Sequence, residues 1–206
     1  MVAKFRKLLD SALLRSDLWS KNDWDGIIAD ANKQLLLEDF GPEQAARIYA
    51  IRGHAWAKKG NLEKALTDFS KAIELDPGEV AHYRDRARIF AGKGDIGAAL
   101  SDIEKAFELK PDHYDTYATR GRIYLQNKEF ENAIQDFSRE VEVAPHFTDA
   151  LKMRAEAYRA LGNIELAEQD EKIYDEALRK AKAEAEKAKE QFDELLETEW
   201  LGQESS

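Results

Sequence analysis

One glycine-rich segment of this chain has residue types and a spacing that could do chemistry. Residues 92–97 read Gly-Lys-Gly-Asp-Ile-Gly, the pattern G-x-G-x-x-G, which holds a dinucleotide pyrophosphate where it links a β-strand to a helix. The residues before it, Tyr83, Ala87 and Phe90, have the spacing of a helix, so the required strand is missing. We therefore expect no nucleotide site here.

The other candidates for chemistry are weaker still. The chain has 4 histidines, but no two of them have the short spacing of metal ligands on one helix. It has no cysteine, which excludes a thiolate nucleophile, a thiolate metal site and a disulfide framework. No Ser-His-Asp set or carboxylate pair can be assigned from spacing. The sequence therefore predicts a protein that is not an enzyme and has no cofactor and no metal.

The elements that carry these residues repeat with a fixed period. Pro77, Pro111 and Pro145 are 34 residues apart, and small and aromatic residues recur at the same offsets upstream of each. A repeat of this length is typical of a helical solenoid. In residues 46–79 two apolar stripes of helical period lie on either side of a break at residues 59–61. Each unit should therefore hold two short helices joined by a tight turn, at Gly60, Gly94, Lys128 and Gly162 in successive units.

Small residues in the first helix and a proline after the second complete each unit. The small side chains allow the two helices to approach closely, and the proline ends the second helix. The recurring positions are Tyr49, Gly53, Trp56, Ala65, Phe69 and Ala72; Tyr83, Ala87, Phe90, Ala99, Ile103 and Ala106; and Tyr117, Gly121, Tyr124, Ala133 and Phe137. This pattern resembles the tetratricopeptide repeat, over residues 46–181. The resemblance implies an all-α fold, an α-α superhelix that continues into a long C-terminal helix.

The repeats also organise the charged residues. Arginines and aspartates each recur with the 34-residue period, at Arg52, Arg86, Arg120 and Arg154 and at Asp68, Asp102, Asp136 and Asp170. We expect the two columns to form a ladder of ion pairs with a structural role. Glu140 breaks the pattern, because it replaces an alanine of the preceding units. A buried unpaired carboxylate is costly, so Glu140 should reach Lys152 or Arg154, or tilt to solvent.

Three regions follow from this pattern. Residues 1–45 form a degenerate repeat that caps the array, and residues 46–163 form the solenoid. The solenoid comprises the units 46–79, 80–113 and 114–147 and the first helix of 148–181. Residues 164–206 form a capping and projecting helix with a polar tail. The N-terminus is too polar for a secretory signal and no run reaches the ~18 apolar residues of a membrane span, so we expect a cytoplasmic protein without membrane insertion.

The C-terminal helix carries a stripe that we call the seam. Its members are spaced alternately by 4 and 3 residues, which is the spacing of a coiled coil: Tyr174, Leu178, Ala181, Ala185, Ala188, Phe192 and Leu195. Alanines bury little area, so pairing through the seam would be weak. Three readings stay open: a second copy of this chain, giving a weak homo-oligomer, a helix of another protein, or a single solvated helix.

The net charge of the chain and the residues of its predicted groove indicate which class of partner it binds. The chain has a net charge of −10, and residues 164–206 hold 14 acidic and 6 basic residues. An acidic chain without a basic stripe argues against nucleic acid and anionic membranes. The resemblance implies a concave groove lined by the first helices of the units. The residues that could bind a protein or peptide there are Arg47, His54, Arg84, Arg88, Arg122 and Lys152.

The basic residues of this groove could receive an acidic segment through charge-assisted hydrogen bonds; the alternative is a solvated groove. Family members that hold C-terminal carboxylates use a clamp of Lys, Asn, Asn, Lys and Arg. At the matching positions this chain has Ala50, His54, Asp85, Asp115 and Thr119, so the resemblance does not extend to that clamp. The sequence predicts a non-enzymatic interaction scaffold or adaptor. The alternatives are an assembly factor or co-chaperone that holds a client peptide, and a regulatory subunit of an enzyme.

Overall fold

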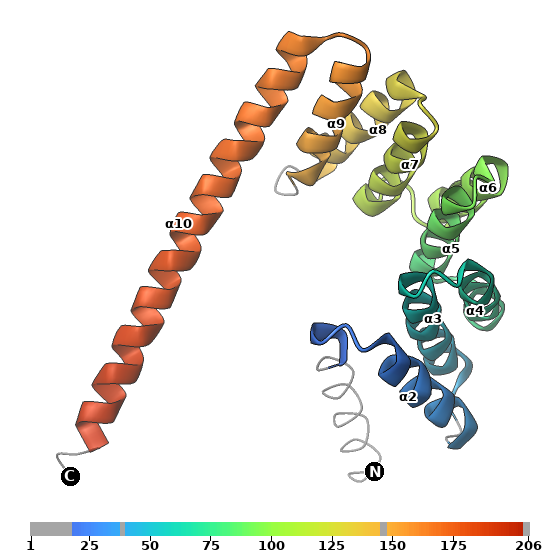
Figure 1. Ribbon diagram of the computed structural model, residues 1–206, viewed down its shortest axis with the longest axis horizontal. Helices are drawn as coiled ribbons and strands as arrows, with labels where there is room; N and C mark the ends of the chain where they lie inside the picture. The colour runs from blue at the N-terminus through green and yellow to red at the C-terminus, as the bar shows by residue number, and fades with distance from the viewer. Residues whose placement is uncertain (1–17, 38–39, 145–147, 204–206) are drawn as a thin grey trace. The chain divides into compact units, whose positions relative to one another are not determined.

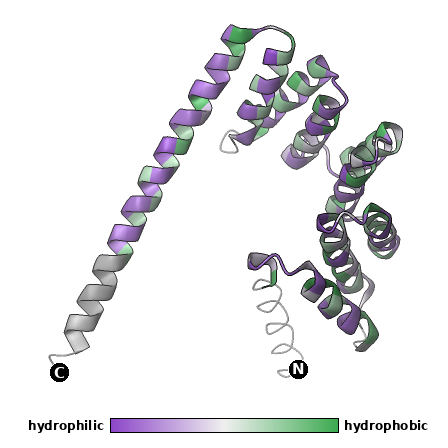
Figure 2. Cartoon of the chain, in the orientation of Figure 1, coloured by the Kyte–Doolittle hydropathy of each residue, from purple (hydrophilic) through white to green (hydrophobic). Residues whose placement is uncertain are grey.

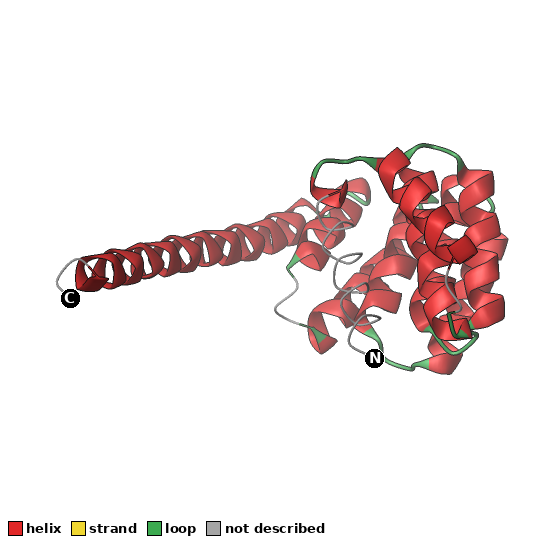
Figure 3. Cartoon of the chain, turned by 90° about the horizontal axis from the view of Figure 1, so that it is seen from below, coloured by secondary structure: helices red, strands yellow, loops and turns green. Residues whose placement is uncertain are grey.

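The chain folds into helices joined by short turns. The computed structural model describes residues 18–37, 40–144 and 148–203, and the side chains of these residues as far as residue 192; within these ranges it contains no strand (Figure 3). The helices are α2 (Trp24–Leu37), α3 (Pro42–Lys58), α4 (Leu62–Leu75), α5 (Val80–Gly92), α6 (Ile96–Leu109), α7 (Tyr114–Gln126), α8 (Phe130–Val143), α9 (Asp149–Ala160) and α10 (Ile164–Gln203) (Figure 1). The predicted all-α fold is confirmed. The first helix expected from the sequence, together with Pro145 and His146, lies outside the described residues.

The helices form two compact units, residues 1–123 and residues 124–206, with the boundary inside α7. In the first unit each helix from α2 to α6 packs against the next one along the chain. In the second unit α8 packs against α9, and α9 packs against the first turns of α10. Consecutive packing of this kind is what a repeat of helix pairs requires.

Left-handed residues form the turns inside the helix pairs. Gly60, Gly94 and Gly162 have φ values of 77°, 84° and 79°, and Lys128 takes the same conformation at 61°. In the first of these turns the amide of Asn61 donates to the carbonyl of Trp56 at 2.9 Å, and the other three repeat this bond. The four predicted turns are confirmed. Since a side chain is strained at positive φ, Lys128 occupies a position where glycine is preferred.

The close helix approach predicted at Gly53 is also observed. A Cβ atom at this position would lie 3.2 Å from the ring of Phe69 and 3.3 Å from the Cβ atom of Asp68. The Phe69 ring is fully buried and packs with the buried alanines Ala46, Ala65 and Ala72. Glycine therefore lets α3 and α4 come together over this ring.

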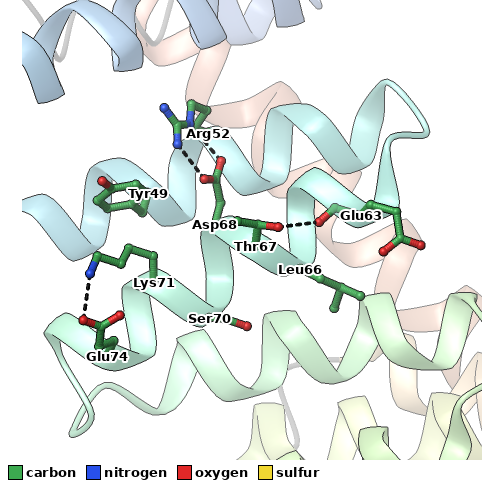
Figure 4. A pocket seen from close by; sticks show the side chains of 9 residues that line it. All are labelled: Tyr49, Arg52, Glu63, Leu66, Thr67, Asp68, Ser70, Lys71 and Glu74. Carbon is green, nitrogen blue, oxygen red and sulfur yellow. Dashed lines mark hydrogen bonds and ion pairs between the residues drawn. The ribbon is translucent and has the colours of Figure 1, made fainter.

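The predicted ion-pair ladder is present along the repeats. Arg52 donates to both carboxylate oxygens of Asp68, at 2.8 and 2.6 Å (Figure 4). The equivalent pairs are Arg86 with Asp102, at 2.8 and 2.7 Å, and Arg154 with Asp170, at 2.8 Å for both bonds. The hydrogen bonds that each arginine donates to its aspartate raise the pKa of the arginine in spite of its burial.

Each of these arginines also reaches the helix pair before its own. The Nη1 atom of Arg52 donates to Asn32 at 2.6 Å, that of Arg86 to Ser70 at 3.1 Å, and that of Arg154 to Ser138 at 2.9 Å. The guanidinium has donors in a fixed fork, so it can satisfy a carboxylate and a neighbour together. The ladder therefore ties successive repeats to one another, as a structural role requires.

Glu140 lies in the interior of the second unit. It is 3% exposed, and the residues at the same position in the preceding repeats, Ala72 and Ala106, are fully buried. Glu140 is buried as these alanines are, so the solvent-facing alternative for Glu140 is wrong. The repeat places its Cα on the face of α8 that packs inward, so the side chain has no route to solvent. A partner at Lys152 or Arg154 stays a prediction.

The last helix pair presents a polar outer face. Glu168, Glu171 and Asp175 stand where the earlier repeats have apolar residues such as Leu66, Phe69 and Ile73. Arg159 donates to both oxygens of Glu171, at 3.0 and 2.5 Å, which replaces the apolar contact made by the phenylalanine elsewhere. Hydrogen bonding to Arg159 lowers the pKa of Glu171. Polar residues at these positions are typical of the terminal unit of a repeat array.

Candidate functional site

Three first helices of the repeats, α3, α5 and α7, lie side by side and carry the candidate binding residues. His54 on α3 contacts Asp85 on α5 at 2.8 Å, and Arg84 on α5 contacts Asp115 on α7 at 2.7 Å. We call the side of these helices that bears the predicted groove residues the groove face. It consists of Arg47, His54, Arg84, Asp85, Arg88, Asp115 and Arg122.

The predicted basic residues differ in how far they reach solvent. Arg47 and Arg122 are exposed, and the Arg88 side chain is 53% exposed. The Arg84 side chain is only 14% exposed, because it turns toward Asp115. Lys152 lies in the other compact unit, on α9, where its ammonium is 5.9 Å from the ring centre of Tyr174. Ion pairs in the structure join three of the six predicted residues, His54, Arg84 and Arg88, to the aspartates of this face.

Two aspartates on the groove face neutralise part of its positive charge. Asp85 pairs with both His54 and Arg88, and Asp115 pairs with Arg84. The side chain of Asp85 is 9% exposed. Burial pushes the pKa of Asp85 up, but the hydrogen bonds and charges of His54 and Arg88 outweigh it and leave the pKa below its ordinary value. Asp85 is therefore ionised near neutral pH. The pairings of His54 with Asp85 and of Arg84 with Asp115 were not foreseen, because contacts between successive repeats are invisible in a single helix pattern.

Behind the groove face lie buried polar atoms without hydrogen-bond partners. Both ring nitrogens of His82 and the hydroxyl of Thr116 are buried in this way, and the two residues are 3% and 0% exposed. His82 and Thr116 occupy the same repeat position, which is held by Ile48 in the first repeat and Ala150 in the fourth. Burial lowers the pKa of His82, against the opposing charges of Glu79, Asp76 and Asp85.

A pocket of 640 Å³ lies away from the groove face, between α3 and α4. Figure 4 shows that its side chains point toward one another: Arg52 binds Asp68, and Lys71 binds Glu74 at 2.7 Å. The hydroxyl of Thr67 donates to the carbonyl of Glu63 at 3.0 Å. These polar groups already satisfy one another, so the lining stabilises the repeat and offers a ligand little that is free.

The seam is partly accessible. Tyr174 is half-buried near α9, the Leu178 residue is 42% exposed and Phe192 is 60% exposed. Figure 2 shows hydrophobic residues recurring along the otherwise hydrophilic α10. The side chain of Leu195 lies outside the described part of the chain. The sequence did not single out Ile173, which is 52% exposed on another side of the same helix.

The glycine-rich segment has no strand before it in the structure. It begins at the end of α5, and Gly94 forms the left-handed turn that precedes α6. Among the described side chains, no three His, Asp or Glu residues gather closely enough to hold a metal ion. In the same part of the chain, no helix is both long and apolar enough to cross a bilayer.

Comparison with known families agrees with the repeat geometry. Two profiles of the tetratricopeptide repeat match the chain, one over residues 46–79 and the other over residues 84–146. Residues 46–79 and 84–146 of the chain are therefore tetratricopeptide repeats. No curated protein sequence is significantly similar to it over its length.

Solved tetratricopeptide-repeat structures share its fold at low sequence identity. The crystal structure of MamA is 21% identical, covers 84% of this chain and 97% of its own, and has a TM-score of 0.62. BtubC from P. vanneervenii is 13% identical, covers 85% and 81%, and has a TM-score of 0.70. The first tetratricopeptide-repeat domain of Spaghetti (RPAP3), bound to the HSP90 peptide SRMEEVD, is 23% identical, covers 58% and 95%, and has a TM-score of 0.53. These likenesses establish the fold alone.

Proposed function

We propose that this tetratricopeptide-repeat protein is a non-enzymatic adaptor that binds an acidic peptide segment on its groove face. The observation that carries the proposal is the charge of that face. Four arginines, Arg47, Arg84, Arg88 and Arg122, stand against two ionised aspartates, so the face has a positive excess in a chain of net charge −10. Arg88 keeps half of its side chain exposed while it is paired, so its remaining donors can reach a ligand.

The similar structure of RPAP3 supports a peptide as the ligand. Its bound peptide, SRMEEVD, carries three acidic residues. The clamp residues of co-chaperones are absent here, so we propose a different acidic segment and not the HSP90 tail. Asp85 and Asp115 take the places of two clamp positions and would repel a terminal carboxylate. The segment should therefore carry its acidic side chains away from these two aspartates, toward Arg88 and Arg122.

A binding measurement with defined peptides tests this proposal. Fluorescence anisotropy should show binding of a glutamate-rich peptide, weaker binding at higher salt, and none of a lysine-rich peptide of equal length. The double variant Arg88→Gln and Arg122→Gln should reduce the affinity about tenfold or more, since each lost charged hydrogen bond is worth roughly 1 kcal/mol or more. The matched control is Lys105→Gln, which removes an exposed cation from α6. Equal binding of both peptides, or an unchanged affinity of the double variant, contradicts the proposal.

The native partner can be sought with the same variants. Pull-down from the native cell should recover a protein with an acidic segment, and the double variant should lose it. If the groove holds unfolded clients instead, as an assembly factor or co-chaperone would, many proteins should be recovered and the double variant should keep most of them. A regulatory subunit should copurify with one enzyme. A cytoplasmic location stays a prediction, which fractionation of that cell tests.

A further inference from the structure

The face of α10 that packs on α9 continues along the helix after α9 has ended. Near the turn this face is covered: Ala167 is fully buried, and Asp170 is 4% exposed and bound to Arg154. Because α9 and α10 form a hairpin, Asp149 at the start of α9 lies at the level of about Tyr174 to Leu178. At ~100° per residue, Tyr174, Leu178 and Phe192 project within about 40° of one another. The exposed seam is thus a direct extension of an interface that already exists.

We propose that a second copy of this chain covers the seam from Leu178 to Leu195 with its own α10 running antiparallel. The partner helix would pack on the same face of α10 as α9 does, beyond the end of α9. It would have the same direction as α9, which is itself antiparallel to α10 in this hairpin. The proposal concerns residues 124–206 and is independent of the groove face, which lies in the first compact unit.

The position of α9 excludes a parallel partner in register. In such a pair, residues 164–174 of each α10 would also have to pack against the seam face of the other α10. That space is occupied by α9, which buries Ala167 and Asp170. In the antiparallel pair the two α9 helices lie at opposite ends of the shared segment, and only the last turns of each α10, residues 198–203, would have to bend away from the α9 of the other copy.

The sizes of the seam residues also suit the antiparallel arrangement. When Leu178 faces Leu195 of the second copy, Phe192 faces Ala181 and Ala185 faces Ala188. Each large side chain then meets a small one or another leucine, and the alanine layers in the middle allow the helices to approach closely. A parallel pair would put Phe192 against its own copy and alanine against alanine, which leaves the helix separation uneven.

The short contact makes the dimer weak. The 18 residues of the segment span ~27 Å, and two of the six layers pair alanine with alanine. The buried area therefore falls below the roughly 1,200 Å² of a standard stable interface, and we expect a Kd on the order of 10 μM to 1 mM. In this arrangement Lys182 lies near Lys189 of the second copy, and the two-fold symmetry gives two such contacts between like charges. Salt screens this repulsion, so added salt should lower the Kd of the dimer.

Sedimentation equilibrium of the full chain over ~10 μM to 1 mM tests the association. Phe192→Ala should raise the Kd about tenfold or more, because a two-fold symmetric interface loses the side chain twice. The matched control is Ile173→Ala, which removes a similarly exposed apolar side chain on α10 outside the seam and should leave the Kd unchanged. A full chain that stays monomeric throughout overturns the proposal, as does a dimer equally sensitive to both substitutions.

A charge reversal tests the orientation. Lys189→Glu turns the repulsion with Lys182 of an antiparallel copy into attraction, so the Kd should fall by roughly threefold or more. In a parallel pair the same substitution would place the new carboxylate against Glu184 of the other copy and raise the Kd. Lys187→Glu, which makes the same charge change on the solvated side of α10, is the control. A Kd that rises with Lys189→Glu overturns the antiparallel arrangement even if a dimer forms.

Discussion

Replacing the buried His82 by isoleucine should stabilise the first compact unit. The imidazole is 3% exposed, and neither ring nitrogen has a hydrogen-bond partner. A buried polar group left without a partner costs about 1–3 kcal/mol, and an apolar side chain of similar volume removes that cost. Ile48 fills the same repeat position in the first repeat at 4% exposure, so the site accepts isoleucine. Isoleucine and histidine have similar helix propensities, so we expect His82→Ile to raise the free energy of unfolding by about 1–2 kcal/mol at neutral pH.

The increase in unfolding free energy caused by His82→Ile should become larger as the pH falls. Burial holds the pKa of His82 below its ordinary value of 6.5 in the folded chain. Below pH ~6.5 the unfolded chain therefore binds a proton that the folded chain does not, and stability falls by at most about 1.4 kcal/mol per pH unit until the folded pKa is reached. His113 adds to this loss, because burial and the charges of Arg84 and Lys110 lower its pKa too. His82→Ile should remove the His82 part of the slope.

Urea unfolding at pH 7.5, 6.5 and 5.5 measures both effects. Tryptophan fluorescence reports mainly on the first unit, which holds Trp19, Trp24 and Trp56, while Trp200 lies in the second. Thr116→Val is the matched control, since it removes an unpaired buried hydroxyl at the same repeat position but cannot titrate. It should stabilise by roughly 1 kcal/mol at every pH. A His82→Ile chain that is no more stable than the parent at pH 7.5, with an unchanged pH slope, would refute the reasoning.

Three further predictions concern the repeats and the C-terminal helix. Lys128→Gly should stabilise the second unit by roughly 0.5–1 kcal/mol, because it relieves a side chain at φ 61°, while Gly94→Ala should destabilise the first; thermal unfolding by circular dichroism compares them. Asp102→Asn should cost roughly 2–4 kcal/mol in urea unfolding, since it leaves a half-buried guanidinium unpaired, whereas Glu108→Gln at an exposed pair should change little. Removal of residues 182–206 should leave the midpoint of thermal unfolding of the repeats unchanged and abolish the dimer in sedimentation; a large loss of repeat stability would contradict this.

The repeat architecture could be predicted from the sequence because each of its parts has a local cause. A left-handed turn needs glycine or tolerates a residue such as Lys128, and a close helix crossing needs a small residue such as Gly53. The arginines and aspartates share the period of 34 residues, and this predicts the pair of Arg52 with Asp68 that the structure contains. The same local logic identified the glycine-rich segment as a turn, since its neighbours have helical spacing.

What the sequence by itself determined, then, is the fold and the faces of its helices; the tertiary structure alone decided how the charges on those faces combine. A helical pattern shows that Arg84, Arg88 and Asp85 point to one side. It does not show that Asp85 also pairs with His54, and Arg84 with Asp115, because these partners lie on other helices and the contacts depend on side-chain rotamers and burial. The burial of His82 is of the same kind, because it follows from the helices packed over it. Secondary structure is set by interactions within a few residues, whereas the electrostatics of a surface are set by distances between elements, which only the packed structure fixes.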